Sequence, residues 1–256
     1  MTKIAEARLH SIETLGLVDG PGIRTVFFLQ GCPLRCLYCH NPDSQTMFSK
    51  RQISSDEVVE IAKRYKPYYK NTGGGVTFSG GEPLLQAEFI IETAKKLKEE
   101  GITTAIDTTG YGDKRYLEEV LKHVDIVLLD IKHFDNEGYK NVTGKSMGGF
   151  YNFLSLLDDF NGTIWIRHVM VPSFTDNKES IINLFNRVKH LAHKINRFEI
   201  LPYHKMGLEK YERLNRKYPL EGIPEMDREK AQEYQDMLAK MLEQERKSMQ
   251  LDKKIG

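Results

Sequence analysis

The chain has few cysteines, almost no excess charge and no long apolar segment. Its 256 residues include 37 Lys and Arg against 36 Asp and Glu, so net charge gives no reason to expect nucleic acid or an anionic membrane as a partner. No apolar run approaches the roughly 18 residues that a membrane helix needs. Residues 1–17 also lack the apolar core of a secretory signal. We therefore predict a soluble, cytoplasmic protein.

The composition is that of a globular protein, with 40% hydrophobic and 29% charged residues. At roughly 150 residues per domain, this length corresponds to one or two domains. No linker rich in Pro, Gly or Ser and no internal repeat divides the chain, which favours one domain over residues 1–245. An amphipathic helix is predicted over Arg228–Leu242, and residues 246–256 are predicted to form a frayed, charged tail.

Six short apolar segments alternate with helical patterns along the chain. They are rich in β-branched and aromatic residues and do not strictly alternate, which is typical of strands buried on both faces of a parallel sheet. Helix boundaries are indicated by a capping box at Ser54–Glu57, a C-terminal Gly101 and an N-cap at Asn177, and a further helix is expected after Gly148-Gly149. The predicted strands are Ile23–Gln30, Val76–Ser79, Thr103–Asp107, Asp125–Asp130, Thr163–Val171 and Arg197–Leu201.

Polar or glycine-rich segments follow these strands. The cysteine loop follows the first, Ser79–Pro83 the second, Asp107–Gly110 the third, Asp130–Lys132 the fourth and Pro202–His204 the sixth. Alternating strands and helices imply right-handed crossovers and a parallel sheet. In (β/α) barrels the active site lies where the parallel strands end. We predict an α/β fold, an incomplete (β/α)6 barrel, with its site at the C-terminal ends of the strands.

All three cysteines, Cys32, Cys36 and Cys39, lie in one loop. An odd number cannot be fully paired within a chain, and such close spacing is unlike a disulfide framework. A four-iron cluster takes one protein ligand per iron, so three thiolates would leave one iron open. Zinc bound with His40 as fourth ligand is a competing interpretation, disfavoured because His40 is adjacent to Cys39. Cysteines that are simply buried small side chains are a third.

The order of these motifs resembles that of the radical S-adenosylmethionine enzymes. Cys-x3-Cys-x2-Cys over residues 32–39 and Gly80-Gly81-Glu82 carry the resemblance. Val18-Asp-Gly-Pro-Gly-Ile-Arg24 is similar to the signature of the glycyl-radical-enzyme activases in that family, and three cysteines leave none for the ferredoxin-like insert of several activases. The similarity continues, to about residue 220, through Asp107-Thr108, Asp130-Ile-Lys132, Trp165-Ile-Arg167 and Leu201-Pro-Tyr-His204.

The resemblance implies an iron–sulfur oxidoreductase with one [4Fe-4S] cluster on Cys32, Cys36 and Cys39, and S-adenosylmethionine (SAM) on the open iron. In that family an electron cleaves SAM to methionine and a 5′-deoxyadenosyl radical, which abstracts a hydrogen from a glycine of a partner enzyme. The expected target is a glycyl radical enzyme, pyruvate formate-lyase, with flavodoxin or ferredoxin as electron donor. A monomer working anaerobically is expected, with no catalytic residue beyond the cluster and SAM, and with no nucleic acid or membrane as partner.

The resemblance also implies roles for single residues. Gly80 and Gly81 would let the backbone approach the methionine amino group, and Asp130-Ile-Lys132 would hold the zwitterionic methionine end. Asp107-Thr108 would offer oxygens to a monovalent cation. The residues expected at SAM are Tyr38, Cys39, His40, Gly80, Gly81, Glu82, Asp107, Thr108, Asp130, Ile131, Lys132 and His204.

Asp19 and Arg167 are expected to hold the glycine loop of the partner protein. An arginine among apolar neighbours in a strand is costly to bury without a partner, so Arg167 is predicted to point into the barrel. There a guanidinium and a carboxylate would bind the backbone of an extended loop by charge-assisted hydrogen bonds. The alternative is a structural ion pair between Asp19 and Arg167.

Other functions stay open at this point. A non-catalytic iron–sulfur electron carrier would need a fourth cysteine ligand and would not need Gly80-Gly81-Glu82. An activase of another glycyl radical enzyme would have the same motifs. A radical enzyme acting on a small molecule is disfavoured by Asp19–Gly22, but only through the resemblance.

Overall fold

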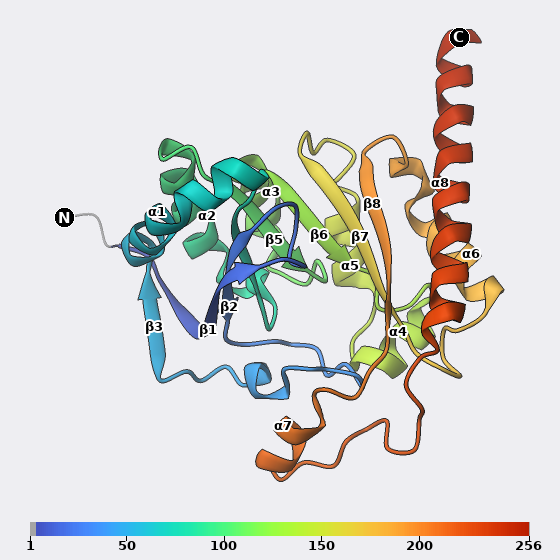
Figure 1. The fold of residues 1–256 in the computed structure, drawn as a ribbon, viewed down its shortest axis with the longest axis horizontal. Coiled ribbons are helices and arrows are strands. Elements are labelled where there is room, and N and C mark those ends of the chain that lie inside the picture. Colours follow the sequence, from blue (N-terminus) through green and yellow to red (C-terminus); the bar gives the residue numbers. More distant parts are fainter. Residues whose placement is uncertain (1–3, 256) are drawn as a thin grey trace.

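An open, curved sheet of eight strands forms the centre of the molecule (Figure 1). The structure is a computed structural model that describes residues 4–255, with side chains described for residues 4–251. The strands are β1 (Glu6–Gly16), β2 (Arg24–Leu29), β3 (Arg51–Ser54), β4 (Gly75–Gly80), β5 (Thr103–Thr108), β6 (Ile126–Asp130), β7 (Thr163–Met170) and β8 (Ile195–Pro202). The α-helices are α1 (Ser55–Thr72), α2 (Ala87–Glu99), α3 (Lys114–His123), α4 (Asn136–Thr143), α5 (Gly148–Leu154), α6 (Lys178–Val188), α7 (Leu208–Arg213) and α8 (Arg228–Ile255). Three short 3-10 helices are η1 (Pro42–Gln45), η2 (Pro83–Gln86) and η3 (Lys189–Leu191).

The sheet is mostly parallel. In its order β3-β1-β2-β4-β5-β6-β7-β8, strands β2 and β4 to β8 pair in parallel, whereas β1 pairs antiparallel with β2 and β3. Each predicted strand overlaps one of the parallel strands. In the described part of the chain β3 and β8 are the two edges and do not pair with each other. The sheet is thus a partial barrel, and the predicted incomplete (β/α)6 barrel is confirmed.

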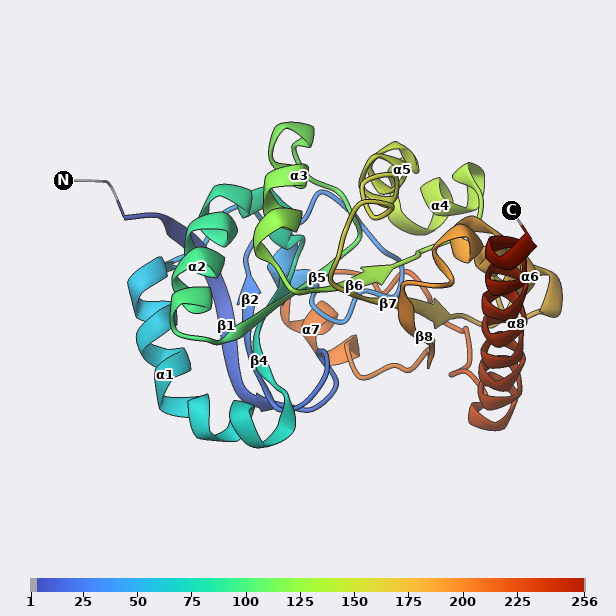
Figure 2. The same cartoon turned by 90° about the horizontal axis from the view of Figure 1, so that it is seen from above.

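Helices cover the outer face of the curved sheet, and α7 lies on the opposite side (Figure 2). Three predicted helix boundaries are confirmed. The Ser54 side chain accepts a hydrogen bond from the Glu57 backbone, and the Glu57 carboxylate accepts one from the Ser54 backbone at 2.8 Å. Asn177 caps α6, and Gly101 follows α2 with a φ of 66°. Gly148-Gly149 lies inside α5 and not before it.

The strands bury apolar side chains on both faces. On the outer face Phe27 and Phe78 belong to the main core, and the Phe78 ring meets the Phe89 ring of α2 edge-on at 5.9 Å between centroids. On the inner face Leu128 and Trp165 belong to a separate small apolar cluster. Each fully buried side chain of this size contributes about 1.5–3 kcal/mol. The barrel wall is therefore rigid enough to hold polar groups at defined positions.

The C-terminal segment differs from the expectation of a frayed tail over residues 246–256. Helix α8 continues to Ile255. The Arg246 guanidinium donates hydrogen bonds to the carbonyls of Ala192 and Ile195, and Met249 packs against the main core. These contacts attach the second half of α8 to the barrel. No helix within residues 4–255, α8 included, combines the length and apolarity needed to cross a bilayer.

Candidate active site

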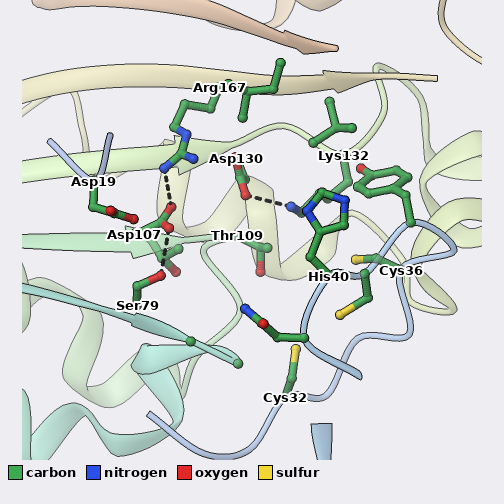
Figure 3. A pocket seen from close by; sticks show the side chains of 18 of the residues that line it. Asp19, Cys32, Cys36, His40, Ser79, Asp107, Thr109, Asp130, Lys132 and Arg167 are labelled. Atoms are coloured by element: carbon green, nitrogen blue, oxygen red, sulfur yellow. Dashed lines mark hydrogen bonds and ion pairs between the residues drawn. The ribbon is translucent and has the colours of Figure 1, made fainter. Parts of the chain in front are cut away.

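Polar side chains form a layer inside the barrel, directly beyond the small apolar cluster. Alternate residues of a strand face the same side of the sheet. Two residues after Leu128 and Trp165 on the same strands come Asp130 and Arg167, which are directly paired in the β6–β7 register. On β5, Asp107 lies two residues after Ala105 of the same cluster and pairs with Leu128, two residues before the level of Asp130. Strand periodicity thus brings two carboxylates and a guanidinium together from three strands (Figure 3).

These side chains line a cavity of about 580 Å³, a size suited to a small-molecule ligand. Glu82 and Ile131 are the predicted site residues that do not line it. The lining also includes Ser79, Trp165 and the ion-paired Arg197 and Glu199, which the sequence analysis assigned no role at the site. The predicted site residues in the lining are Asp19, Cys32, Cys36, Tyr38, Cys39, His40, Gly80, Gly81, Asp107, Thr108, Asp130, Lys132, Arg167 and His204.

The three cysteines all reach this cavity from the loop after β2. The loop is tied to α4, because the Arg35 backbone N–H donates to the Thr143 carbonyl at 2.7 Å. Burial raises the pKa of Cys32 and of Cys36 to about 12, and it raises the pKa of Cys39 as well. At neutral pH the free thiols are therefore protonated, and binding of metal would release their protons.

His40 faces another histidine instead of the cysteines. Its ring lies against the His204 ring, with 4.2 Å between centroids, and its Nε2–H donates to the His204 carbonyl at 3.1 Å. Among the described residues, no group of three or more His, Cys, Asp or Glu is arranged to hold one metal ion. The position of His40 disfavours the zinc interpretation, in which it would join the three cysteines.

The two glycines after β4 are required by the chain's own backbone. A Cβ at Gly81 would lie 2.1 Å from the Gly31 carbonyl oxygen, and one at Gly80 would lie 2.4 Å from the Leu29 nitrogen. Gly80 also has a φ of 111°, which other residues rarely adopt. Both glycines therefore let β4 end closely packed against β2, and this packing leaves a part of the cavity wall without side chains.

Asp130 and Lys132 form a buried ion pair on the cavity wall. Lys132 Nζ lies 2.6 Å from Asp130 Oδ2 and 5.7 Å from the centre of the Tyr38 ring. Burial opposes ionisation of Asp130, but Lys132 and Arg167 hold its pKa below the usual value. Asp130 Oδ1 is buried and has no hydrogen-bond partner. The Asp130 carboxylate is thus charged and fixed by Lys132, with one oxygen that receives no hydrogen bond from the chain.

Arg167 forms its ion pair with Asp107, so the alternative of an Asp19–Arg167 pair is wrong. Arg167 Nη1 lies 3.3 Å from Asp107 Oδ1, and the Ser79 hydroxyl donates to Asp107 Oδ2 at 2.8 Å. Neither Nε nor Nη1 of Arg167 completes a hydrogen bond. Burial and the nearby Asp107 raise the pKa of Asp19 to about 6. The guanidinium is thus held beside Asp107 by charge, on the cavity wall, with two of its donor atoms making no hydrogen bond.

Glu82 lies behind the cavity wall. Its carboxylate accepts hydrogen bonds from the hydroxyls of Thr108 (2.5 Å) and Thr109 (2.6 Å) and from the Leu84 backbone (3.2 Å). It therefore ties the end of β4 to the end of β5. The Thr108 hydroxyl, expected to offer an oxygen to a cation, donates its hydrogen to Glu82 and accepts one from the Gly110 backbone at 2.9 Å. Ile131 is fully buried in the main core.

Arg24 was not assigned a role from the sequence, although it ends the Asp19 motif. Its side chain is completely buried and donates to Thr77 Oγ1 (2.6 Å) and to the carbonyls of Val76 (2.6 Å) and Pro21 (3.2 Å). The Thr77 hydroxyl in turn donates to the Asp19 carbonyl at 2.8 Å. Arg24 thus fixes the turn that carries Asp19 into the cavity. An arginine at the start of a buried strand was the available signal.

Comparison with known proteins identifies the family and relatives of this chain. Residues 26–185 match the family model described as the radical SAM superfamily. The chain is 53% identical over 236 residues to the pyruvate formate-lyase-activating enzyme of Clostridium pasteurianum. The aligned region covers 92% of this chain and 98% of that protein. It is 45% identical over 231 residues to the enzyme of the same name from Staphylococcus aureus, covering 88% and 92% of the two chains.

Solved structures share the fold. One is a domain of a pyruvate-formate lyase-activating enzyme from Bacteroides vulgatus, with a TM-score of 0.53 and 24% identity over 66% of this chain and 94% of that one. Another is a methylornithine synthase, with a TM-score of 0.59 and 16% identity over 88% of this chain and 63% of that one. At such low identity these structures support the partial barrel alone.

Proposed function

This chain belongs to the radical SAM superfamily, and we propose that it places a radical on a glycine of a partner enzyme, pyruvate formate-lyase. As a member of that superfamily it is an oxidoreductase that uses a [4Fe-4S] cluster and SAM. The observation that carries the proposal is its identity, 53% and 45% over most of the chain, to proteins named for this activity.

The cavity fits both groups. Three thiols from one loop can ligate three irons and leave the fourth for SAM. Asp130 Oδ1 is buried without a hydrogen-bond partner, and Lys132 lies beside this carboxylate, which suits a ligand with both a positive and a negative group. The wall beside Gly80 and Gly81 carries no side chains. A cavity of about 580 Å³ can hold a ligand of this class.

Each residue would contribute binding or orientation. When bound, the cluster supplies the electron that splits SAM into methionine and a 5′-deoxyadenosyl radical. The Asp130 carboxylate would accept a hydrogen bond from the methionine amino group, and Lys132 would hold that carboxylate ionised. Tyr38, His40 and His204 would bound the adenine side of the cavity, and a monovalent cation would contact Asp107.

The partner's glycine loop would enter at the other end of the cavity. Figure 3 shows Asp19, Asp107 and Arg167 grouped at one end and Cys32 and Cys36 at the other. A guanidinium with unused donors can bind backbone carbonyls of an extended loop. The Asp19 carboxyl can accept a backbone N–H. These two side chains would therefore orient the glycine, and cluster and SAM would carry out the chemistry.

We further propose that the chain works as a cytoplasmic monomer under anaerobic conditions, with flavodoxin or ferredoxin as its electron donor. An iron without a thiolate ligand reacts readily with oxygen, which supports anaerobic operation. Reduction by one electron calls for a carrier protein that delivers single electrons. Gel filtration of the cluster-loaded chain under argon tests the monomer directly.

A reconstitution experiment tests the function. The chain would be loaded with iron and sulfide under argon and mixed with dithionite, SAM and pyruvate formate-lyase. The expected result is a protein glycyl radical on the lyase, seen as a doublet by electron paramagnetic resonance, together with 5′-deoxyadenosine. A lyase whose target glycine is replaced by alanine serves as control. SAM cleavage without the doublet would point to another target, and no cleavage would reject the proposal.

A further inference from the structure

A second hollow lies on the outside of the cluster loop. We call it the outer hollow; its volume is about 400 Å³, and its lining is Arg35, Pro42, Asp43, Gln45, Thr46, Met47, Leu214 and Arg216. These residues come from the cysteine loop, from η1 and from the segment after α7, which lies beside η1 (Figure 1). Arg216 joins the two segments, because its Nη1 donates to the Pro42 carbonyl at 3.3 Å.

Gln45 separates this hollow from the cavity of the cysteines. It is the one residue that lines both spaces in the described part of the chain. On the outer side its Oε1 accepts a hydrogen bond from Arg216 at 3.0 Å. On the inner side its carbonyl accepts the Cys32 N–H at 3.4 Å. The wall is therefore one residue thick, with bonded contacts across it.

The surface of the outer hollow is basic and apolar. Arg35 and Arg216 are exposed and contribute two positive charges. The carboxylate in the lining, Asp43, is hydrogen-bonded to His10 at 2.9 Å and lies 3.8 Å from the Lys210 ammonium, which offsets its charge. Met47 and Leu214 are 49% and 41% exposed. Exposed apolar side chains among unpaired cations are typical of a protein–protein contact that binds an acidic partner.

We propose that the outer hollow docks an acidic one-electron carrier protein and that the electron enters through Gln45 to the cluster. The inference rests on the proposed function, which requires a reduced cluster. Electron transfer slows steeply with distance, so the thinnest part of the wall is the favoured entry point. One electron leaves the carrier's reduced prosthetic group and enters the cluster; no bond forms or breaks, and no proton is transferred.

This placement lets two partners bind together. The outer hollow adjoins the cysteine end of the cavity, whereas Asp19 and Arg167 lie at its other end (Figure 3). The carrier and the glycine loop of the target would therefore approach from different sides. Activation would not require the carrier to leave before the target binds.

The test uses two opposite substitutions at one exposed position. Leu214→Glu and Leu214→Arg both remove the leucine, but they add opposite charges to the outer hollow. Each cluster-loaded variant would be reduced either by dithionite or by a reduced bacterial flavodoxin chosen for its net negative charge. The readouts are the rate at which cluster absorbance bleaches and the affinity of the flavodoxin for the chain. Arg64→Glu, at an exposed position of α1, lowers the net charge by two units against one for Leu214→Glu, and is therefore a stricter control for added negative charge away from the outer hollow.

With flavodoxin, Leu214→Glu should bleach about tenfold more slowly at low salt, whereas Leu214→Arg should match or exceed the parent rate. Added salt should reduce the difference. All variants should bleach at the parent rate with dithionite. Parent-rate reduction of Leu214→Glu by flavodoxin, or equal slowing by Arg64→Glu, would overturn the docking site. Equal slowing by both Leu214 variants would overturn the acidic nature of the partner. Loss of dithionite-driven SAM cleavage in the parent chain would instead reject the proposed function, and the affinity measurement would still test the surface.

Discussion

Replacing Arg167 by leucine should destabilise the folded chain by about 3 kcal/mol near pH 8. The Arg167 side chain is 13% exposed, and its Nη1 lies 3.3 Å from Asp107 Oδ1. At an effective dielectric constant of about 20, two unit charges at that distance attract by about 5 kcal/mol. Removing one partner of a buried pair costs about 3–5 kcal/mol. We take the lower end of this range because the cavity opens to water.

The loss should be smaller in acid. Burial raises the pKa of Asp107, and Arg167 partly offsets that effect, so the variant raises this pKa further. A carboxyl with a higher pKa in the folded than in the unfolded chain binds its proton more tightly when folded. Its contribution to the free energy of unfolding therefore falls as pH rises from about 4 through the folded pKa. The cost of Arg167→Leu should be smallest near pH 5 and largest above pH 8.

Urea unfolding followed by circular dichroism, with the cluster-loaded chain under argon, measures both values. Adding Asp107→Asn to Arg167→Leu should recover at least half of the loss, because the unpaired carboxylate is then gone. Arg197→Leu, at the more exposed pair with Glu199, should cost less than about 1 kcal/mol. An equal loss at pH 5 and pH 8, or no recovery in the double variant, would refute the reasoning.

Four further predictions concern the cluster, the target loop and the fold. Cys36→Ser should prevent assembly of a four-iron cluster, measured by iron and sulfide content; a full cluster in this variant would disprove the ligand assignment. Asp19→Asn should leave SAM affinity unchanged and slow glycyl radical formation on the target. The pKa of about 6 makes ionisation of Asp19 unfavourable in the folded chain, so the parent's free energy of unfolding falls as pH rises from about 4 to 6, and this fall should be smaller in the variant. Gly81→Ala should abolish stable folding, since its Cβ would lie 2.1 Å from a carbonyl oxygen. Gly148→Ala is the contrasting variant, because Gly148 lies in a helix and an added Cβ would be 3.6 Å from its nearest neighbour; it should stabilise the folded chain by about 0.5–1 kcal/mol in thermal unfolding. Gln235→Ala should cost about 1–3 kcal/mol, because the Gln235 amide satisfies the N–H of Ile200 and the carbonyl of Phe198 on edge strand β8 at 2.7 Å each; an unchanged urea midpoint would contradict this.

The sequence alone determined the parallel strands and the cysteine loop. Strand β6 begins with a continuous apolar run, Ile126–Leu129, and such runs indicate burial on both faces wherever they lie in a chain. Cys32, Cys36 and Cys39 are close in sequence, so their convergence depends on one loop. Capping at Ser54 and Asn177 depends on residues three positions away. All these signals are local.

Short sequence patterns did not predict the elements whose structure depends on contacts with distant parts of the chain. Strand β1 carries polar residues at many positions, and it forms because β2 and β3 pair with it on both sides. The end of α8 was expected to fray because it is charged. It stays helical where Arg246 and Met249 contact the barrel.

Only the tertiary structure decided the partners inside the cavity. The sequence indicated Asp19, Asp107, Glu82 and Arg167, but not which carboxylate pairs with the guanidinium. In the parallel register Asp107 lies two residues before the level of Asp130 and Arg167, and the Asp107 and Arg167 side chains meet across this step. At the end of β5, threonine hydroxyls donate to Glu82. Pairing of this kind depends on distances between strands far apart in the chain. These distances are set by sheet order and twist, which no single segment of the sequence specifies.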